Sequence, residues 1–339
     1  MFLEAFEDYI DITDRFDSVN MKIEAYVESV VREFNINKEE SELKVLQESG
    51  TEEDLQYLYT EAEEGALSKV KKAVRTIIEA FKQFCSDLKS KVVRIIVNTE
   101  TKTTLKKIEK KVKLNPFFAK KKVQVIDKKK PLKVIAQYKS KAEKHLAKVK
   151  SGVFKESEIT SITSDMESYA SAYKAAIAGT AATVTVTVVK LLADINSEYN
   201  ALPSHIDKID KETSQILENL CKTLDNEEKV AVKAAFTSAA NFRAKLAKDE
   251  ANEHVDAIMN KISVLKKAVS KSKDDSKVQA NPIKESSEDD EDYNAYEEST
   301  LLDDDFEGLF DGYMESSDYS ESFESADDLL NDLDLLLND

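Results

Sequence analysis

The chain has 339 residues, enough for one or two domains with a sizeable core, yet it contains only six Gly and four Pro. Average proteins contain about 7% Gly and 5% Pro, and sheet-rich and α/β folds use both residues in their turns. Their scarcity favours long helices joined by few connections. Lys, Glu, Ala, Leu and Ser dominate the composition, which suits helices equally well. The composition therefore predicts an all-α fold and disfavours sheet-based architectures.

The formal net charge of −17 conceals blocks of opposite sign. Residues 1–64 carry 5 basic and 19 acidic side chains, whereas residues 65–155 carry 27 basic and 6 acidic ones. Residues 156–280 are nearly balanced at −3, and residues 281–339 carry a net charge of −21. Because protein surfaces usually mix the two signs, this segregation asks for an explanation. Either acidic segments fold back on the basic block, or the block binds an external polyanion that those segments mask.

The first 64 residues are predicted to form short amphipathic helices. In Asp17–Phe34 the apolar residues recur at helical spacing on one stripe. Thr51 followed by Asp54 is a pattern typical of a helix N-terminus. The helix that starts there is predicted to end at Gly65, because glycine is favoured just beyond the last helical turn.

The basic block, residues 65–155, is predicted to be helical, and residues 66–97 give its clearest pattern. Twelve apolar residues of this segment fall within about 120° of arc on a helical projection, and the Lys and Arg residues lie outside that arc. An ordinary surface helix with its apolar stripe on the core explains the pattern. A helix presented to nucleic acid or to an anionic membrane is the alternative. Residues 101–114 continue as a basic helix, and Val123–Ile126 have some strand character.

The lysines of this block are interleaved with few aromatic residues, which suits phosphate neutralisation more than base reading. Any contact with nucleic acid would then be independent of sequence and sensitive to salt. The candidate polyanion-binding residues are Lys69, Lys72, Arg75, Lys82, Lys89, Arg94, Lys106, Lys107, Lys110, Lys111, Lys120, Lys121, Lys122, Lys128, Lys129 and Lys130.

Residues 156–271 are predicted to form a helical bundle. Residues 164–202 look like one long helix that is apolar nearly all round in its middle, as expected of a buried central helix. The uncharged run Ala175–Val189 is shorter than the 18 to 20 or so residues that span a bilayer, but a membrane-inserting helix is an alternative for it. Two further amphipathic helices, at 204–224 and 227–270, complete a three-helix unit.

Residues 272–339 are predicted to be a disordered acidic tail on compositional grounds. A solubilising tail is one interpretation. Phe, Tyr and Leu residues are scattered through it, however, so the alternative is an acidic segment that also carries apolar side chains. Such a segment can dock into a basic, apolar-lined groove of a partner, or mask residues 65–155 of its own chain.

Conventional catalytic motifs are absent from the sequence. It contains no P-loop, GxGxxG, GxSxG or HExxH pattern. Its three histidines, His145, His205 and His254, fall on different predicted helices, and Cys85 and Cys221 are far apart. We therefore expect a non-enzymatic protein, with no catalytic residues, no cofactor and no metal site.

Two short patterns coincide with breaks in the N-terminal half: Leu46-Gln47-Glu48 precedes Ser49, and Ala62-Glu63-Glu64 precedes Gly65, where the charge reverses. With this layout, residues 1–151 resemble internal head proteins of large tailed bacteriophages. In that class an acidic N-terminal propeptide directs the protein to the prohead. A maturation protease removes the propeptide by cutting after the Glu that ends a three-residue pattern of this kind. The resemblance implies cleavage at Glu64–Gly65 or Glu48–Ser49. It would leave a basic N-terminal region suited to packaged DNA.

The leading hypothesis is a structural protein of the virion, made in the bacterial cytoplasm and carried in the phage head or acting in head assembly. Its expected partners are other virion proteins, the protease, DNA without sequence preference, and a basic partner for the acidic tail. One alternative is a membrane-active protein that uses residues 66–97 and 175–189, with the membrane a less favoured partner. Another is an acidic-tailed adaptor, which would be cytoplasmic.

Overall fold

The computed structural model describes residues 2–47, 51–148, 156–180, 182–224 and 229–279. Its elements, in chain order, are α1 (Phe2–Gln47), α2 (Glu52–Asp87), the π-helical turn η1 (Leu88–Val93), α3 (Arg94–Ile96), α4 (Thr99–Leu114), α5 (Pro116–Lys120), β1 (Lys122–Ile126), α6 (Lys129–Lys148), α7 (Glu156–Ala178), β2 (Thr183–Thr187), α8 (Val188–Leu224) and α9 (Val230–Gln279). The prediction of an all-α bundle of long helices is confirmed.

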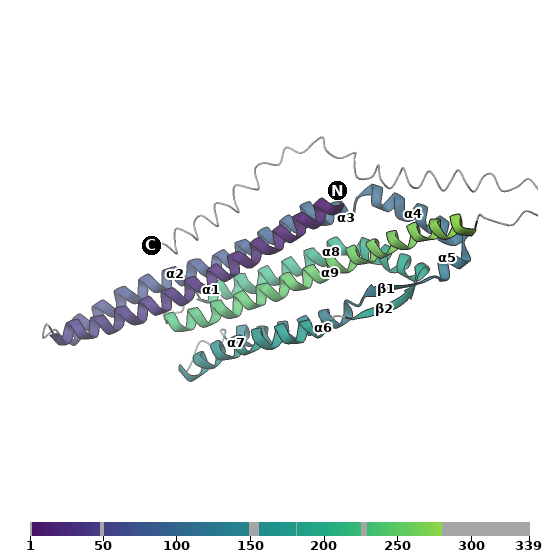
Figure 1. The fold of residues 1–339 in the computed structure, drawn as a ribbon. Helices are drawn as coiled ribbons and strands as arrows, with labels where there is room; N and C mark the ends of the chain where they lie inside the picture. The colour runs from purple at the N-terminus through teal and green to yellow at the C-terminus, as the bar shows by residue number, and fades with distance from the viewer. Residues whose placement is uncertain (1, 48–50, 149–155, 181, 225–228, 280–339) are drawn as a thin grey trace, which may run out of the picture.

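The bundle is elongated, and its longest helices run side by side along it (Figure 1). The 50 residues of α9 correspond to about 75 Å at a rise of 1.5 Å per residue. This helix contacts α1, α2, α6, α7 and α8, so it is the central element of the core. Small side chains let the neighbouring helices approach it closely. Its buried alanines include Ala235, Ala239, Ala240, Ala244, Ala247 and Ala251.

The prediction that residues 164–202 form a single central helix is wrong. Helix α7 ends at Ala178, and the strand β2 (Thr183–Thr187) separates it from α8. β2 pairs antiparallel with β1, with Val125 opposite Val184. The alternating, β-branched sequence TVTVT favours a strand once a partner strand is within reach. That partner lies in Val123–Ile126, the segment whose strand character the sequence indicates.

The prediction of short helices in the first 64 residues is also wrong. α1 is one helix of 46 residues, and α2 passes through Gly65 without a break. A glycine inside a helix costs about 1 kcal/mol relative to alanine, which an extended apolar stripe can offset. The predicted start of α2 is confirmed: the Asp54 backbone N–H donates to Thr51 Oγ1 at 3.3 Å, and the Thr51 N–H donates to Asp54 Oδ2 at 2.9 Å.

The apolar stripe of residues 66–97 faces the core, which confirms the interpretation as an ordinary surface helix. The buried positions run from Val70 through Phe81 to Ile96. The segment is not one regular α-helix, however, because η1 interrupts it at Leu88–Val93. Such a wider turn changes the angular position of the residues that follow it, and Leu88 and Val92 both remain buried here.

One hydrophobic core continues across the charge boundaries. It includes Ile12 and Ile23 of residues 1–64, Phe81 of the basic block and Phe236 of residues 156–280. Residues 9–30 of the acidic N-terminal segment are thus packed into the same bundle as the rest. α9 continues as a helix to Gln279, past the boundary predicted at residue 272. The remainder of the predicted acidic tail, from residue 280, lies outside the described residues.

The end of α1 and the start of α2 extend beyond the rest of the bundle as a hairpin, at the left of Figure 1. We call residues 31–47 of α1 and 52–64 of α2 the N-terminal arm. None of its described side chains is buried, whereas α1 has buried residues in every turn from Tyr9 to Val30. At the opposite end lie α4, α5 and the last turns of α9.

Candidate polyanion-binding end

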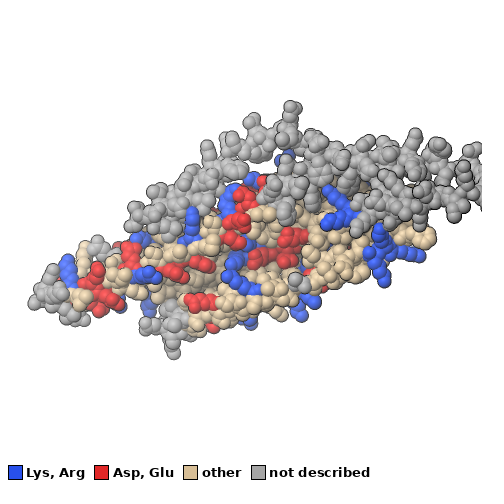
Figure 2. Space-filling model, in the orientation of Figure 1, with Lys and Arg blue, Asp and Glu red and all other residues tan. Residues whose placement is uncertain are grey.

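Most of the candidate lysines gather at one end of the bundle. Residues 99–133, which we call the basic end, comprise α4, α5, β1 and the start of α6 and carry 13 Lys against 3 Asp or Glu. Figure 2 shows Lys and Arg side chains gathered toward the right-hand end of the molecule, where α4 and α5 lie in the same view. A net charge of +10 is therefore concentrated on a short stretch of surface.

Helix α4 presents its lysines because its apolar residues fix its rotation. Leu105, Ile108 and Val112 are buried at helical spacing, and α4 packs on α8. Asn98 begins the helix by accepting a hydrogen bond from the Thr101 N–H at 2.6 Å. The Asn98 carbonyl in turn accepts a hydrogen bond from the Tyr199 hydroxyl at 2.5 Å, which ties this helix start to α8. The lysines on the opposite face are consequently held toward solvent.

The corner between α4 and α5 exposes two large apolar side chains among these lysines. Asn115 caps α5 through a hydrogen bond from the Phe118 N–H at 3.0 Å, with Pro116 in the first helical position. Phe118 is buried beneath the corner, whereas Leu114 is 80% exposed and Phe117 is 91% exposed. Exposed apolar groups of this size at the end of a molecule suggest a contact with another molecule.

The strand β1 extends the basic end along the surface. Lys122, Gln124 and Ile126 alternate with the buried Val125 and are exposed on the outer face of the two-stranded sheet. The sheet is anchored to α9 because the Ile126 N–H donates to Asn260 Oδ1 at 3.1 Å.

Several basic side chains of this end have no acidic partner within the described parts of the chain. They are the exposed lysines Lys102, Lys106, Lys110, Lys120, Lys122, Lys129, Lys130 and Lys133. Lys107, Lys111 and Lys121 belong to the same surface but make contacts within the chain. The structure thus brings together most of the candidate residues numbered from 106 upward.

Lys128 is an exception, because its charge is used inside the protein. Its ammonium group lies 2.6 Å from a carboxylate oxygen of Glu198, and Lys261 lies 2.7 Å from the same oxygen. Burial alone would raise the pKa of Glu198, but hydrogen bonds from the two lysines outweigh it and hold that pKa below its usual value. Lys128 therefore fastens β1 and α6 to α8 and is a poor candidate for an external ligand.

The candidate residues of α2 lie along the bundle, and half of them are engaged in ion pairs. Lys69 contacts Glu33 at 3.0 Å, and Lys82 contacts Glu218 at 2.6 Å. Such exposed pairs contribute little stability, but they do lower the charge available to a ligand.

Lys89 lies 3.2 Å from Asp207 and 3.4 Å from Asp210. Partial burial would lower the pKa of Lys89, but these two carboxylates raise it overall. Lys72, Arg75 and Arg94 are exposed without an acidic partner in the described chain, and Arg94 lies beside the start of α4. The sequence therefore overstates the available charge of α2.

The two candidate cleavage sites differ in their surroundings. Glu64 and Gly65 lie inside α2, well before its end at Asp87. A protease that binds an extended substrate would have to unwind the helix there. Glu48 and Ser49 lie between α1 and α2, outside the described residues.

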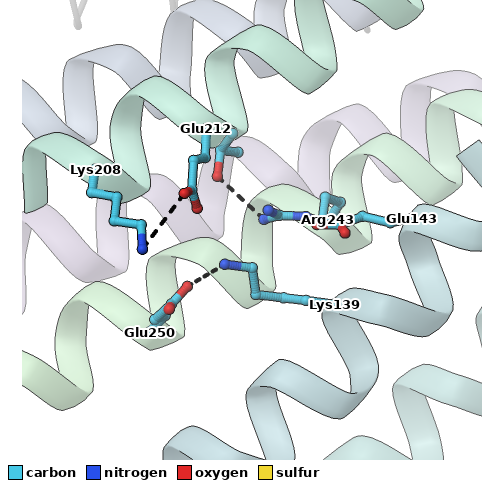
Figure 3. A network of polar contacts seen from close by, with 7 residues as sticks. Lys139, Glu143, Lys208, Glu212, Arg243 and Glu250 are labelled. Carbon is cyan, nitrogen blue, oxygen red and sulfur yellow. Dashed lines mark hydrogen bonds and ion pairs between the residues drawn. The ribbon is translucent and has the colours of Figure 1, made fainter. Parts of the chain in front are cut away.

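A second cluster of charged residues, which the sequence does not reveal, lies between α6, α8 and α9 (Figure 3). Arg243 of α9 is only 1% exposed, and its Nε donates to Glu143 of α6 at 2.8 Å. Its Nη1 donates to Thr213 Oγ1 of α8 at 3.2 Å, and Lys139 of α6 pairs with Glu250 of α9. The buried guanidinium group of Arg243 therefore has hydrogen-bond partners on both α6 and α8. We interpret the cluster as a structural clamp that holds α6, α8 and α9 together.

Within the described parts of the chain, no three or more His, Cys, Asp or Glu side chains are placed so that they could hold a metal ion. None of the described helices combines the length and apolar character that crossing a membrane requires. Comparisons of the chain with protein-family models, with curated proteins and with solved structures find no match. The charge and exposure of the basic end are therefore the observations from which function is inferred.

Proposed function

We propose that this protein is a non-enzymatic structural component of a tailed-phage virion, carried in the head or acting in its assembly, whose basic end contacts DNA without reading its sequence. The observation that carries the proposal is the set of exposed lysines at the basic end that have no acidic partner among the described residues. The resemblance of residues 1–151 to internal head proteins supplies the setting.

The spacing of the lysines suits a phosphate backbone. Lys102, Lys106 and Lys110 follow one another at four-residue intervals on α4, so they lie about 6 Å apart along its axis. Lys120 and Lys122 continue the row past the corner with α5. Flexible ammonium groups act as point charges toward phosphates, and each phosphate contact releases counterions. Such a surface binds duplex DNA through its charge and has no means of distinguishing bases.

The test is a titration of fluorescently labelled duplex DNA with the full chain at several salt concentrations. We expect affinity to fall steeply with salt. Replacing four lysines by glutamine, Lys106, Lys110, Lys120 and Lys122, should lower the slope of log affinity against log salt by about 3 to 4.

A matched control replaces four exposed lysines away from the basic end, namely Lys69, Lys82, Lys174 and Lys208. It should leave the slope nearly unchanged. Equal effects of the two variants would show that the net charge matters and the basic end does not. Binding that is insensitive to salt would contradict the proposal and point to a protein partner.

The setting in the virion has its own test, the intact mass of the protein recovered from purified particles. Cleavage after Glu64 or Glu48 should give a shortened chain that begins at Gly65 or Ser49. A chain from mature particles that still begins at Met1 would refute the propeptide, and absence of the protein from particles would refute the virion role.

A further inference from the structure

The N-terminal arm consists of two helices, and none of the other described helices covers them (Figure 1). Helices in stable domains bury their apolar stripe against other elements on more than one side, and two isolated helices are marginal in water. The two helices of the arm contact each other: the Tyr59 hydroxyl of α2 donates to Glu42 of α1, and Lys38 lies 5.4 Å from the centre of the Tyr59 ring. Its apolar residues Val31, Phe34, Leu55 and Leu58 are only half-buried, and Val31 and Phe34 pack against the edge of the core.

Exposed apolar side chains are concentrated at the two ends of the molecule. Among the described residues, ten large hydrophobic side chains are exposed. Three are on the arm, three are in the basic end, and two are on or just after the strand paired with β1. These eight are Ile36, Leu43, Tyr57, Leu114, Phe117, Ile126, Val184 and Val189. Apolar groups collected in this way mark surfaces that a partner covers.

The two ends also carry opposite charge. The arm has 3 basic and 10 acidic residues, a net charge of −7, against +10 for the basic end. Because the arm and the basic end lie at opposite ends of the bundle, one copy cannot bring its own two surfaces together (Figure 1). We propose that the arm of one copy docks on the basic end of the next, so that copies of this chain associate head to tail.

A contact between different surfaces of identical chains is heterologous, and it forms rings if the rotation closes and filaments if it does not. Opposite charges would steer the two ends together, and the exposed apolar side chains would supply the buried centre of the contact. The acidic residues 281–339 are another candidate occupant of the basic end. Because the charge of residues 281–339 has the same sign as that of the arm, they could not cover the arm. Among the described surfaces, the basic end complements the arm in both charge and exposed apolar side chains.

The inference shares the basic end with the proposed DNA contact but does not require DNA. Self-association is measured on the full chain without nucleic acid, by sedimentation velocity over a range of protein and salt concentrations. We expect assemblies larger than a monomer at low salt that dissociate as salt is raised, because screening weakens the attraction between exposed charges. A chain that is monomeric under all of these conditions would refute the inference while leaving DNA binding open.

Charge reversal identifies the surfaces. Reversing three arm residues (Glu39→Lys, Glu40→Lys and Glu53→Lys) should abolish self-association, as should reversing three lysines of the basic end (Lys106→Glu, Lys110→Glu and Lys120→Glu). Mixing the two variants should restore assembly, because each then offers a complement to the other. A control with the same change of charge on the body of the bundle, Glu28→Lys, Glu79→Lys and Glu167→Lys, should assemble like the parent chain.

Zero-length cross-linking of a mixture of ¹⁴N- and ¹⁵N-labelled chains distinguishes the occupants. The inference requires mixed-isotope peptides that join carboxylates of the arm to lysines of the basic end. If those lysines link only to carboxylates of residues 281–339, the tail is the occupant and the inference is wrong. The result for the arm variant must agree, since a tail-occupied basic end would not respond to Glu39→Lys.

Discussion

The imidazole rings of His205 in α8 and His254 in α9 stack face to face, with their centroids 4.5 Å apart and their planes 9° apart. The pair lies at the contact between two of the central helices of the bundle. Burial, together with the charges of His205 and Lys128, lowers the pKa of His254 to about 4 against the opposing effect of Glu250 and Glu198. The neutral form of His254 is therefore part of the folded state at neutral pH.

This pair predicts that acid weakens the fold. An unfolded histidine takes up a proton near pH 6.5, whereas His254 in the folded protein does so only near pH 4. Between these values the unfolded state binds more protons, so stability should fall as pH is lowered. His254→Gln should reduce the difference in unfolding free energy between pH 7.5 and pH 5.5 by about 1 kcal/mol. Urea unfolding at the two pH values measures it, and an unchanged pH dependence would contradict the prediction.

Glu253, the neighbour of His254 in the sequence, predicts the opposite slope. Burial, together with the nearby carboxylates of Asp256 and Asp249, raises the pKa of Glu253 to about 7. Between about pH 4.5 and 7 the folded state binds more protons than the unfolded state, so this group favours the fold less as pH rises.

Glu253→Gln removes the cost of ionising that carboxylate and should stabilise the protein at pH 8 by about 1 kcal/mol. At pH 5 it should have almost no effect. The measurement is again urea unfolding, with the exposed Glu79→Gln as a control that should be neutral at both pH values. A loss of stability at pH 8 would show that the charge of Glu253 is used in the fold.

The Arg243 clamp predicts an uneven response among the charged residues of Figure 3. Arg243→Met keeps much of the side-chain volume but removes the bonds to Glu143 and Thr213 across three helices. We expect a loss of about 1 to 3 kcal/mol, since Thr213 stays buried while Glu143 can be hydrated.

Lys208→Met serves as the comparison because Lys208 forms only an exposed pair with Glu212 on the same helix, at 3.8 Å. It should cost less than about 0.5 kcal/mol. Thermal or urea unfolding of the two variants at neutral pH decides between them. Similar small losses would mean that Arg243 acts as a packed side chain and that its hydrogen bonds contribute little.

How far the sequence predicts this molecule depends on the range of the signal. The stripe from Val70 to Ile96 could be predicted because each apolar residue repeats within one or two turns. The failure at residues 164–202 has a distant cause, since Thr183–Thr187 becomes a strand only because Lys122–Ile126 pairs with it. A periodicity argument confined to one segment does not contain that partner.

At the candidate site, too, local features could be predicted from the sequence and long-range contacts could not. The charge of the basic end is visible in the composition of residues 99–133, but the availability of each lysine is not. Lys128 and Lys82 look alike in the sequence, yet each is paired with a glutamate of α8 more than 60 residues away. The burial of Arg243 was equally hidden, because its partners Glu143 and Thr213 come from two other helices.

Substituting Gly65 tests whether α2 continues as a helix through this position. It lies inside α2, is exposed, and a Cβ added to it would meet no atom within 4 Å. Gly65→Ala should therefore stabilise the protein by about 1 kcal/mol, because alanine loses less conformational freedom in a helix. If α2 instead ended at Gly65 with the left-handed conformation typical of a helix end, alanine would be strained and the variant would be less stable.

The control for this substitution is Ser68→Gly, at an exposed position one turn further along the same helix. It should destabilise the protein by about 0.5 kcal/mol, the reverse of the change at Gly65. The same pair bears on processing, because cutting the Glu64–Gly65 bond requires α2 to unwind locally. If the proposed processing occurs at this bond, Gly65→Ala should slow removal of residues 1–64, and Ser68→Gly should speed it, as followed by the intact mass of the chain. Equal rates in both variants would mean that the helix around Gly65 does not limit cleavage there.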